Sequence, residues 1–407
     1  MLDLVYLSVR NIFRNRRRTA ITVFSIVVGF AAMACFGGFI EFSFAGLRET
    51  TIRTQLGHLQ IYARGYSQNR VSDPESVLIS EPDEVMARIA ELPGVAAVTP
   101  RLSFSGLGST GSSTVNVSVV GVDPEGEEEF ADFETLVAGR PLEPGDPEAG
   151  LIGEELRSGL GAEVGDWVTV LTTSFDGVIN AVDFRVAGVV RTGSKEYDSV
   201  FVKVPIELAQ RAKETGEVER IVVLLHDTDD LPALQPRIEA MLSTFGDGFE
   251  TRRWDELAGF YDAVVALYTG IFTVFAGIVG VVVMFSVANT MTMAVFERTA
   301  EIGALRAIGA RRSTLVAMFL TEGVGVGLLG AGLGVAASWL IAGAVQAMGG
   351  IAMPPPPGMS QGFQAYFSLT GGVLRNAFAV TVAATLVSAV YPAYAASRIR
   401  IVEALQQ

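Results

Sequence analysis

Four long runs without a charged side chain constrain what this chain of 407 residues can fold into. The runs cover residues Thr19–Ile40, Ala263–Phe296, Gly323–Leu374 and Asn376–Ser397. About 20 apolar residues cross the hydrocarbon core of a bilayer as a helix, so each run can hold a membrane span. The third run can hold one span, a loop and the start of the next. The pattern therefore predicts an α-helical membrane domain of four spans.

The arginines beside these runs indicate which side of the membrane each segment occupies. By the positive-inside rule, arginine-rich segments next to spans stay in the cytoplasm. This places both termini and the loop at residues 297–312 inside, and residues 48–260 and 348–370 outside. The flanking arginines are Arg10, Arg14, Arg16, Arg17, Arg18, Arg298, Arg306, Arg311, Arg312, Arg398 and Arg400.

The acidity of the chain belongs to the large segment between the first two spans. The formal charge of the whole chain is −14, but residues 48–260 hold 37 acidic and 18 basic residues, while the remainder holds 7 and 12. An acidic surface argues against nucleic acid as a partner, because phosphate contacts need clustered lysine and arginine. We interpret the acidity as a means of solubility rather than of cation binding.

Residues 48–260 alternate between short strand-like and helix-like stretches, which predicts a mixed α/β domain inserted between spans one and two. The segment at 218–257 favours a β-α-β unit with a polar helix near Leu231–Leu242. About 210 residues can bury a substantial core, and the pattern allows two lobes. The stretch Asp83–Pro100 predicts a helix, a Pro-Gly stop and a strand. Further strands are predicted within Gly57–Tyr66, Ser113–Glu127, Gly165–Leu171, Asp183–Val190 and Asp198–Val204.

The second apolar run is longer than a span requires. Its 34 residues would measure about 51 Å as a helix against a hydrocarbon core of about 30 Å. We infer a stalk that projects from the bilayer, although a tilted or broken helix would also fit.

These observations divide the whole chain into nine predicted segments. They are an interfacial helix at 1–18, span one and stalk at 19–47, the outer domain at 48–260, stalk and span two at 261–296, a cytoplasmic helix at 297–312, span three at 313–347, an outer proline-rich loop at 348–370, span four at 371–397 and a cytoplasmic tail at 398–407.

Sequence motifs of catalysis and cofactor binding are missing. The chain has no Walker A, HExxH, CxxC or GxSxG pattern. Its two histidines, His58 and His226, stand alone in strand-like segments and are interpreted as half-buried strand residues rather than metal ligands. We expect no catalytic site, no metal site and no cofactor bound by this chain.

The cytoplasmic loop is short, amphipathic and continuous with membrane helices at both ends. Ile302, Leu305 and Ile308 form an apolar ridge at three-residue spacing, and Gly303 and Gly309 allow close approach or a break. A cytoplasmic partner that moved this helix would also move spans two and three. The alternative is an ordinary surface helix with solvated charges.

The same loop carries a family resemblance. The string ERTAEIGALRAIGARRSTL at Glu297–Leu315, with FLTEG at Phe319–Gly323, resembles the signature of the FtsX/MacB-type permeases, the type VII ABC transporters. The stretch YPAYAASRIRIVEAL at Tyr391–Leu405 is similar to the end of that permease domain. VVGVDPE at Val119–Glu125 and GAEVGDWVTV at Gly161–Val170 are similar to the MacB-like periplasmic core domain, and the overall plan is closest to the lipoprotein-releasing LolC/LolE branch.

The resemblance implies a subunit in the bacterial inner membrane with a periplasmic domain. It implies a dimer with a second permease, of the same or a homologous chain, bound to two cytoplasmic ATPase subunits. The ATPases, expected on a separate chain, use ATP and Mg²⁺ and move the periplasmic domain by mechanotransmission. The loop becomes the coupling helix, with candidate residues Glu297, Arg298, Glu301, Ile302, Gly303, Leu305, Arg306, Ile308 and Gly309.

The resemblance leaves the substrate open. Release of lipoproteins or another lipidated substrate ranks first, with membrane lipids and a periplasmic chaperone or adaptor as further partners. Efflux of peptides, toxins or drugs ranks second, and FtsX-like signalling to cell-wall hydrolases third. A candidate substrate cavity or dimer interface comprises Phe30, Met33, Phe36, Phe39, Phe272, Phe275, Met284 and Phe285.

Span three adds two features with open interpretations. Its glycines form GxxxG pairs at Gly323–Gly327 and Gly330–Gly334, suited to packing within the subunit or between subunits. Glu322 is a membrane carboxylate, and it is either a structural hydrogen-bond partner or a proton site. The loop at Pro354–Pro357 predicts a stiff extended cap or a contact surface.

Overall fold

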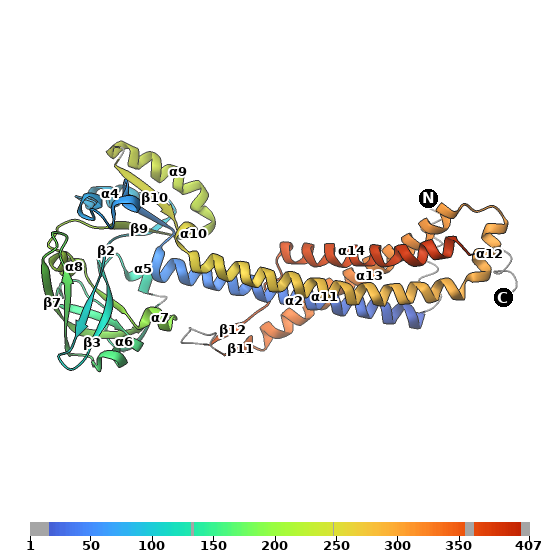
Figure 1. The fold of residues 1–407 in the computed structure, drawn as a ribbon, viewed down its shortest axis with the longest axis horizontal. Helices are drawn as coiled ribbons and strands as arrows, with labels where there is room; N and C mark the ends of the chain where they lie inside the picture. The colour runs from blue at the N-terminus through green and yellow to red at the C-terminus, as the bar shows by residue number, and fades with distance from the viewer. Residues whose placement is uncertain (1–15, 132–133, 247, 355–361, 400–407) are drawn as a thin grey trace. The chain divides into compact units, whose positions relative to one another are not determined.

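The computed structural model describes residues 16–131, 134–246, 248–354 and 362–399 (Figure 1). The predicted interfacial helix at 1–18 and the tail at 398–407 lie largely outside these residues. The described chain forms two compact units. One holds the residues up to Ala45, Val264–Met353 and those from Gln364 onward, and it is helical. The other holds Gly46–Ala263 with residues 354–363, and it is mixed α/β.

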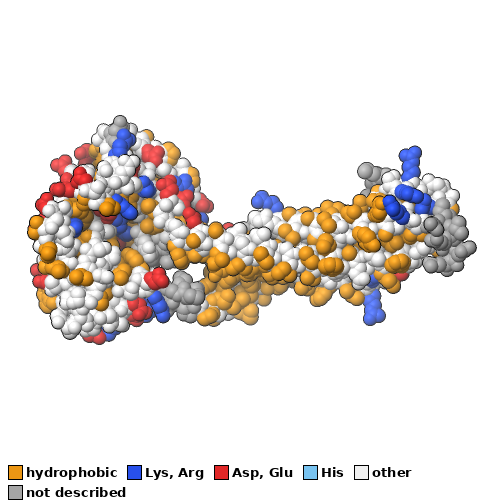
Figure 2. Space-filling view, in the orientation of Figure 1, with side chains coloured by type: hydrophobic (Ala, Val, Ile, Leu, Met, Phe, Trp, Pro, Cys, Tyr) orange, Lys and Arg blue, Asp and Glu red, His pale blue; other side chains and the backbone are white. Residues whose placement is uncertain are grey.

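Four long helices in the described chain are apolar enough to cross a membrane, as the uncharged runs predicted. They are α2 (Arg16–Thr51), α11 (Gly259–Glu297), α13 (Arg312–Ala347) and α14 (Gly371–Ser397). At 36 and 39 residues, α2 and α11 are about 54 and 59 Å long, and α13 also has 36 residues. Hydrophobic side chains cover the visible face of the helical unit, and basic side chains lie toward its ends (Figure 2).

Two short elements complete the helical part of the chain. The helix α12 (Thr299–Ala307) joins α11 to α13. Between α13 and α14, β11 (Ile351–Met353) pairs with β12 (Phe363–Ala365). The sequence did not predict this pair of strands, and most of the proline-rich loop between them lies outside the described residues.

Two glycines of α13 bring it against α14. A Cβ added at Gly323 would lie 2.8 Å from the Cβ of Ala389, and one at Gly327 would lie 2.5 Å from Oγ1 of Thr385. These separations are below any real Cβ contact, so only glycine permits the observed approach of the two helices.

The next two glycines bring α13 against α2. A Cβ at Gly330 would lie 2.5 Å from Cγ2 of Ile26, and one at Gly334 would lie 2.7 Å from the Cβ of Phe30. Both GxxxG pairs therefore serve packing within this subunit, which was the more conservative of the two interpretations of the glycine pattern.

The α/β unit begins at Gly46 within α2, and α2 then passes into a π-helical turn, η1 (Ile52–Leu56). Its strands are β1 (Leu59–Ala63), β2 (Val95–Ser109), β3 (Thr114–Val122), β4 (Thr135–Gly139), β5 (Ala149–Gly153), β6 (Trp167–Thr173), β7 (Ile179–Arg191), β8 (Phe201–Pro205), β9 (Arg220–Leu225) and β10 (Phe249–Arg253). Its helices and turns are α3 (Tyr66–Asn69), η2 (Glu75–Val77), α4 (Pro82–Ala90), α5 (Glu128–Ala131), α6 (Glu154–Leu160), α7 (Lys195–Asp198), α8 (Ile206–Lys213), η3 (Thr228–Asp230), α9 (Leu231–Leu242), η4 (Ser243–Phe245) and α10 (Trp254–Leu257).

Six strands of this unit close into a ring. In order around the ring they are β2, β3, β8, β5, β7 and β6, and β6 pairs back with β2. The pairs β3–β8 and β5–β7 are parallel, and the others are antiparallel. Closure removes exposed sheet edges from these strands.

A second lobe continues from the first half of β2. There β9, β1 and β10 are neighbours, and β1 is antiparallel to both of the others. The connection β9–α9–β10 is therefore a parallel crossover with β1 between its strands, which confirms the predicted β-α-β unit. The two lobes have separate buried cores, one around Ile61 and Ile238 and the other around Phe184 and Val202. The predicted fold class, including two lobes, is confirmed.

The glycine contacts of α13 give a matched pair of variants. Gly334→Val would drive a side chain into Phe30, whereas Gly332 has nothing within 4 Å of its Cβ position. Because overpacking costs about 1–3 kcal/mol, we expect Gly334→Val to lower the thermal unfolding midpoint of the detergent-solubilised protein, and Gly332→Val to leave it unchanged. Equal midpoints for the two variants would contradict the packing described here.

Candidate functional site

The predicted cytoplasmic helix is realised as α12 and the residues on either side of it. Arg298 departs from helical geometry and separates α11 from α12. At the other end, Gly309 has a φ of +98°. The N–H of Gly309 donates to the carbonyl of Arg306 at 3.0 Å, and the N–H of Ala310 donates to that of Leu305 at 3.0 Å. This is a Schellman motif, which ends the helix and lets the chain turn into α13.

The apolar ridge predicted along this helix is split by the structure. Ile302 is 1% exposed and packs into the core of the helical unit. Leu305 is 42% exposed and Ile308 is 87% exposed. Ile302 therefore anchors the helix, while Leu305 and Ile308 leave an apolar surface uncovered within the described residues. Gly303 is buried and Glu301 is exposed.

A buried ion pair joins the start of α12 to α13. Nη1 of Arg298 lies 3.1 Å from Oε2 of Glu322, and both side chains are 7% exposed. A second pair, between Arg18 and Glu297 at 2.6 Å, ties the start of α2 to the end of α11. Glu322 thus has the hydrogen-bond partner that one interpretation of its sequence context required.

A hydrogen bond to a backbone carbonyl links α12 to the chain just after α14, the fourth membrane helix. Nη1 of Arg306 donates to the carbonyl of Ile399, just after α14, at 2.6 Å. The segment from Glu297 to Arg306 is therefore bonded to residues of α2, α13 and the end of α14, and it continues directly from α11. A cavity of about 20 Å³ beside Glu322 and Thr290 has room for about one water molecule, so no substrate passes there in this conformation.

The aromatic residues proposed for a substrate cavity have different surroundings. Phe30 and Met33 are at most 1% exposed and pack in the core between α2, α11 and α13. The ring of Phe36 lies 6.0 Å from that of Phe272 and 4.8 Å from that of Phe275. These five side chains fill space within the subunit.

The remaining members of that set lie further out. Phe39 and Met284 are half-buried, and Phe285 is 68% exposed. Of the eight, Phe285 is the side chain most available to a substrate, a lipid or a second subunit.

The α/β unit holds a buried charge network that the sequence did not reveal. Arg101 of β2 donates to Glu127 at 2.8 Å and to the carbonyl of Gln55 in η1 at 2.6 Å. Lys203 of β8 lies 3.3 Å from Glu127 and 2.5 Å from Glu134. The four charged side chains are 4–7% exposed, and their formal charges sum to zero. Burial raises the pKa of Glu127, but Arg101 and Lys203 outweigh burial and hold this pKa below its ordinary value.

A second chain of hydrogen bonds fixes the last turns of α2. His58 is 0% exposed, and its Nδ1 accepts from the N–H of Leu225 at 3.0 Å. Its Nε2 therefore carries the proton and donates to Thr228 at 2.9 Å, and Thr228 donates to Glu49 at 3.0 Å. The interpretation of His58 as half-buried is wrong, because these bonds satisfy both ring nitrogens and allow complete burial. His226 is exposed.

The sequence held weak signals for these two networks. Lys203 stands in a strand of otherwise apolar residues, where a charge needs a buried partner. The partners themselves could not be found, because they lie up to 179 positions away along the chain.

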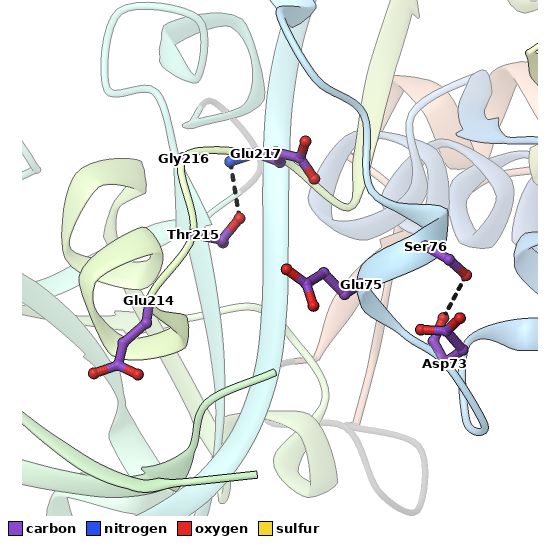
Figure 3. Close-up of a pocket in the computed structure, with 7 residues that line it drawn as sticks. All are labelled: Asp73, Glu75, Ser76, Glu214, Thr215, Gly216 and Glu217. Atoms are coloured by element: carbon purple, nitrogen blue, oxygen red, sulfur yellow. Dashed lines mark hydrogen bonds between the residues drawn. The ribbon is translucent and has the colours of Figure 1, made fainter. Parts of the chain in front are cut away.

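A surface pocket of about 610 Å³ lies between the segments Asp73–Ser76 and Glu214–Glu217 (Figure 3). Glu75 points into the space between them. The N–H of Glu217 donates to Oγ1 of Thr215 at 3.1 Å, which fixes that loop. No group of three or more His, Cys, Asp or Glu side chains within the described ranges is arranged to hold a metal ion. We assign no cation site to this pocket.

These features define a class: a multi-pass membrane protein with an α/β domain after its first span and a short amphipathic helix between its second and third. A family model described as the MacB-like periplasmic core domain matches residues 19–241, and one described as the FtsX-like permease C-terminal region matches residues 273–401. The first match covers more than half of the chain. The chain therefore belongs to the FtsX/MacB family of ABC transporter permeases.

Individual relatives have low sequence identity to this chain. The lipoprotein-releasing system transmembrane protein LolC of Neisseria meningitidis is 27% identical over 257 residues, covering 61% of each chain. The macrolide export ATP-binding/permease protein MacB of Bdellovibrio bacteriovorus is 24% identical over 435 aligned positions, covering 100% of this chain and 62% of that protein. The chain thus spans about three fifths of the length of these relatives. The periplasmic region of MacB from Actinobacillus actinomycetemcomitans matches with a TM-score of 0.38 at 17% identity, over 51% of this chain and 94% of that one.

The two family models show that the chain carries the periplasmic core and permease regions of this family. It lies in the inner membrane as a multi-pass protein with a periplasmic domain, and members of the family work with ABC ATPase partners.

The Arg298–Glu322 pair makes a prediction about stability. Removing one member of a buried pair leaves the other charge uncompensated, at a cost of about 3 kcal/mol or more. We expect Glu322→Ala to lower the thermal unfolding midpoint strongly, and the double variant Arg298→Met with Glu322→Leu to be less destabilised than Glu322→Ala alone. A double variant destabilised as much as Glu322→Ala, or more, would contradict this account of the pair.

His58 makes a prediction about pH. Burial, above all, lowers its pKa from 6.5 to about 4, with Glu49 opposing and Arg53 and Arg48 adding smaller effects. The unfolded chain therefore takes up the proton first as the pH falls, so the stability contribution is complete above about pH 6.5 and declines toward about pH 4, by up to ~3 kcal/mol. Thermal unfolding of the solubilised protein at about pH 7.5 and about pH 5 measures this loss.

The control variant for this experiment is His58→Gln, whose amide keeps one donor and one acceptor but does not titrate. We expect it to lose less stability than the wild type between the two pH values. An identical loss in both proteins would assign the pH dependence to other groups.

Proposed function

We propose that this chain is a mechanotransmitting permease subunit. Its termini and α12 face the cytoplasm, where an ABC ATPase dimer that uses ATP and Mg²⁺ binds α12. Closure of the ATPase dimer moves α12, and the membrane helices pass the movement to the periplasmic domain. A second permease subunit completes the transporter.

The observation that carries this proposal is the two-sided character of α12. One side is anchored: Ile302 is buried in the helical core, Arg298 bonds to Glu322 of α13, and Arg306 bonds to the carbonyl of Ile399 just after α14. The other side presents Leu305 and Ile308. A helix that merely covered a loop would not need both an anchor to its neighbours and an uncovered apolar surface.

The substrate we propose is a lipidated protein extracted from the inner membrane and passed to a periplasmic chaperone. The similarity to LolC and the exposed Phe285 on α11 support it. In this role α2 and α11 extend beyond the bilayer as a stalk, consistent with lengths that exceed a hydrocarbon core of about 30 Å.

Efflux with a periplasmic adaptor is the second candidate. The specific observation in its favour is coverage, because the MacB relative aligns with 100% of this chain and the LolC relative with 61%. Purification of the chain in mild detergent from its native host, with mass spectrometry of bound proteins, distinguishes the two. A lipoprotein and its chaperone would support release, and an adaptor protein without a lipoprotein would support efflux. Recovery without any ABC ATPase would contradict the proposed function itself.

The exposed side of α12 gives a direct test. Ile308→Asp places a charge on the uncovered surface, and we expect it to reduce ATPase co-purification at least tenfold while the unfolding midpoint stays near that of the wild type. Ile302→Asp is the contrasting variant, because its buried charge should unfold the helical unit. Normal ATPase binding by Ile308→Asp would place the docking surface elsewhere.

A further inference from the structure

A small polar cavity lies within the helical unit, where α2, α11 and α13 meet. Its volume is about 20 Å³. The polar side chains around it include Arg18 and Thr22 of α2, Thr290 of α11 and Glu322 of α13. Thr22 is 1% exposed and Glu322 is 6% exposed. One water molecule needs about 10–15 Å³ of such space, so the cavity accepts a ligand of that size and nothing much larger.

Arg18 brings an unsatisfied donor to this cavity. Its Nη1 pairs with Glu297 at 2.6 Å, but its Nε is buried and has no hydrogen-bond partner among the described residues. A guanidinium group carries donors and no acceptor, so only an acceptor can complete its hydrogen bonding. A buried donor without a partner is unfavourable, and the cavity therefore requires a group that accepts.

The other polar groups at the cavity offer acceptors. The hydroxyl of Thr290 donates to the carbonyl of Ser286 at 2.9 Å. Its only proton is then used, so Thr22 is the donor in the 2.7 Å contact between the two hydroxyls. The oxygen of Thr22 keeps its lone pairs for a further donor. The carboxylate of Glu322, which faces Arg298 at 3.1 Å, is an acceptor on both of its oxygens.

The charges around the cavity decide against an ion as its ligand. Arg18 and Glu322 have opposite charges, and each already faces an opposite charge, at Glu297 and Arg298 respectively. A cation or an anion would add an unbalanced charge to a buried site. An apolar group would leave Nε of Arg18 without an acceptor. A neutral molecule of the size of water, which both accepts and donates hydrogen bonds, meets these requirements.

We propose that this cavity binds one water molecule, which accepts from Nε of Arg18 and donates to Thr22 and Glu322. The water joins two ion pairs, Arg18–Glu297 and Arg298–Glu322, into one hydrogen-bonded network that includes α2, α11 and α13. Buried waters in proteins typically make about three hydrogen bonds, as this one does. The inference goes beyond the proposed function, because it assigns a ligand to the helical unit whether or not an ATPase binds α12.

The first test replaces the water with a side chain. Ala294 of α11 lines the cavity and is 2% exposed. Ala294→Thr and Ala294→Val both fill the cavity, and their similar shape makes any overpacking equal. Only threonine supplies a hydroxyl in place of the water. For the full-length protein in detergent, we expect the unfolding midpoint of Ala294→Thr to lie about 2–4 °C above that of Ala294→Val.

Ala276 provides the matched control. It is 8% exposed on the same helix, packs in an apolar cluster with Phe30 and Met33, and does not line the cavity. A threonine hydroxyl can bond to the preceding helical turn equally at both positions, so this effect cancels in the comparison. We expect Ala276→Val to be at least as stable as Ala276→Thr. Finding this same order at position 294 would overturn the proposal.

A crystal structure of the full-length chain, at a resolution that shows ordered waters, locates the ligand even if the variants at position 294 fold poorly. We expect one density peak within hydrogen-bond distance of Nε of Arg18 and of Glu322, without anomalous signal after growth with rubidium or bromide salts. An anomalous signal there would identify an ion, and a cavity without a peak would remove the ligand; either result overturns the proposal. No measurement here involves the ATPase, so this proposal and the proposed function can fail separately.

Discussion

The hydrocarbon core of a membrane offers no hydrogen-bond partners, and the helical unit is organised by this constraint. Where a polar group enters the unit, a second one meets it: Arg298 faces Glu322 at 3.1 Å, and the hydroxyl of Thr22 lies 2.7 Å from that of Thr290. These polar atoms are buried, so the loss of one partner leaves the other without its hydrogen bond in a medium of low dielectric constant. The hydroxyl of Thr381 in α14 is an exception, buried without a partner among the described residues.

This constraint explains why α12 can transmit movement on the proposed function. Its links to the membrane helices are the buried pair at Arg298, the bond from Arg306 to the carbonyl of Ile399 and the burial of Ile302. Breaking any of them exposes a charge or a large apolar side chain to an unsuitable environment. On the proposed function, a displacement of α12 would strain these links unless the ends of α11, α13 and α14 moved with it.

The sequence predicts what depends on local composition. Four spans follow from four uncharged runs, and α9 at Leu231–Leu242 from a polar helical pattern. The sequence does not predict features that depend on where a residue lies in the folded chain. Residues three apart turn by about 60° from one another on a helix, so a ridge at Ile302, Leu305 and Ile308 cannot keep one side, and its ends face the core and solvent. The strand β5, buried on both faces, has no alternation to reveal it.

Two kinds of contact hold α2 in place. Hydrogen bonds and ion pairs lie near both of its ends, and close packing against glycines lies between them. Apolar contacts such as Gly334 against Phe30 resist separation but have little directional preference. Hydrogen bonds depend on angle, so Arg18 to Glu297 near one end and Thr228 to Glu49 near the other oppose rotation of the helix about its axis. The neutral network around Arg101 adds a bond to the carbonyl of Gln55, just after the helix. Each of these directional bonds fixes its own end of α2 within the unit to which that end belongs.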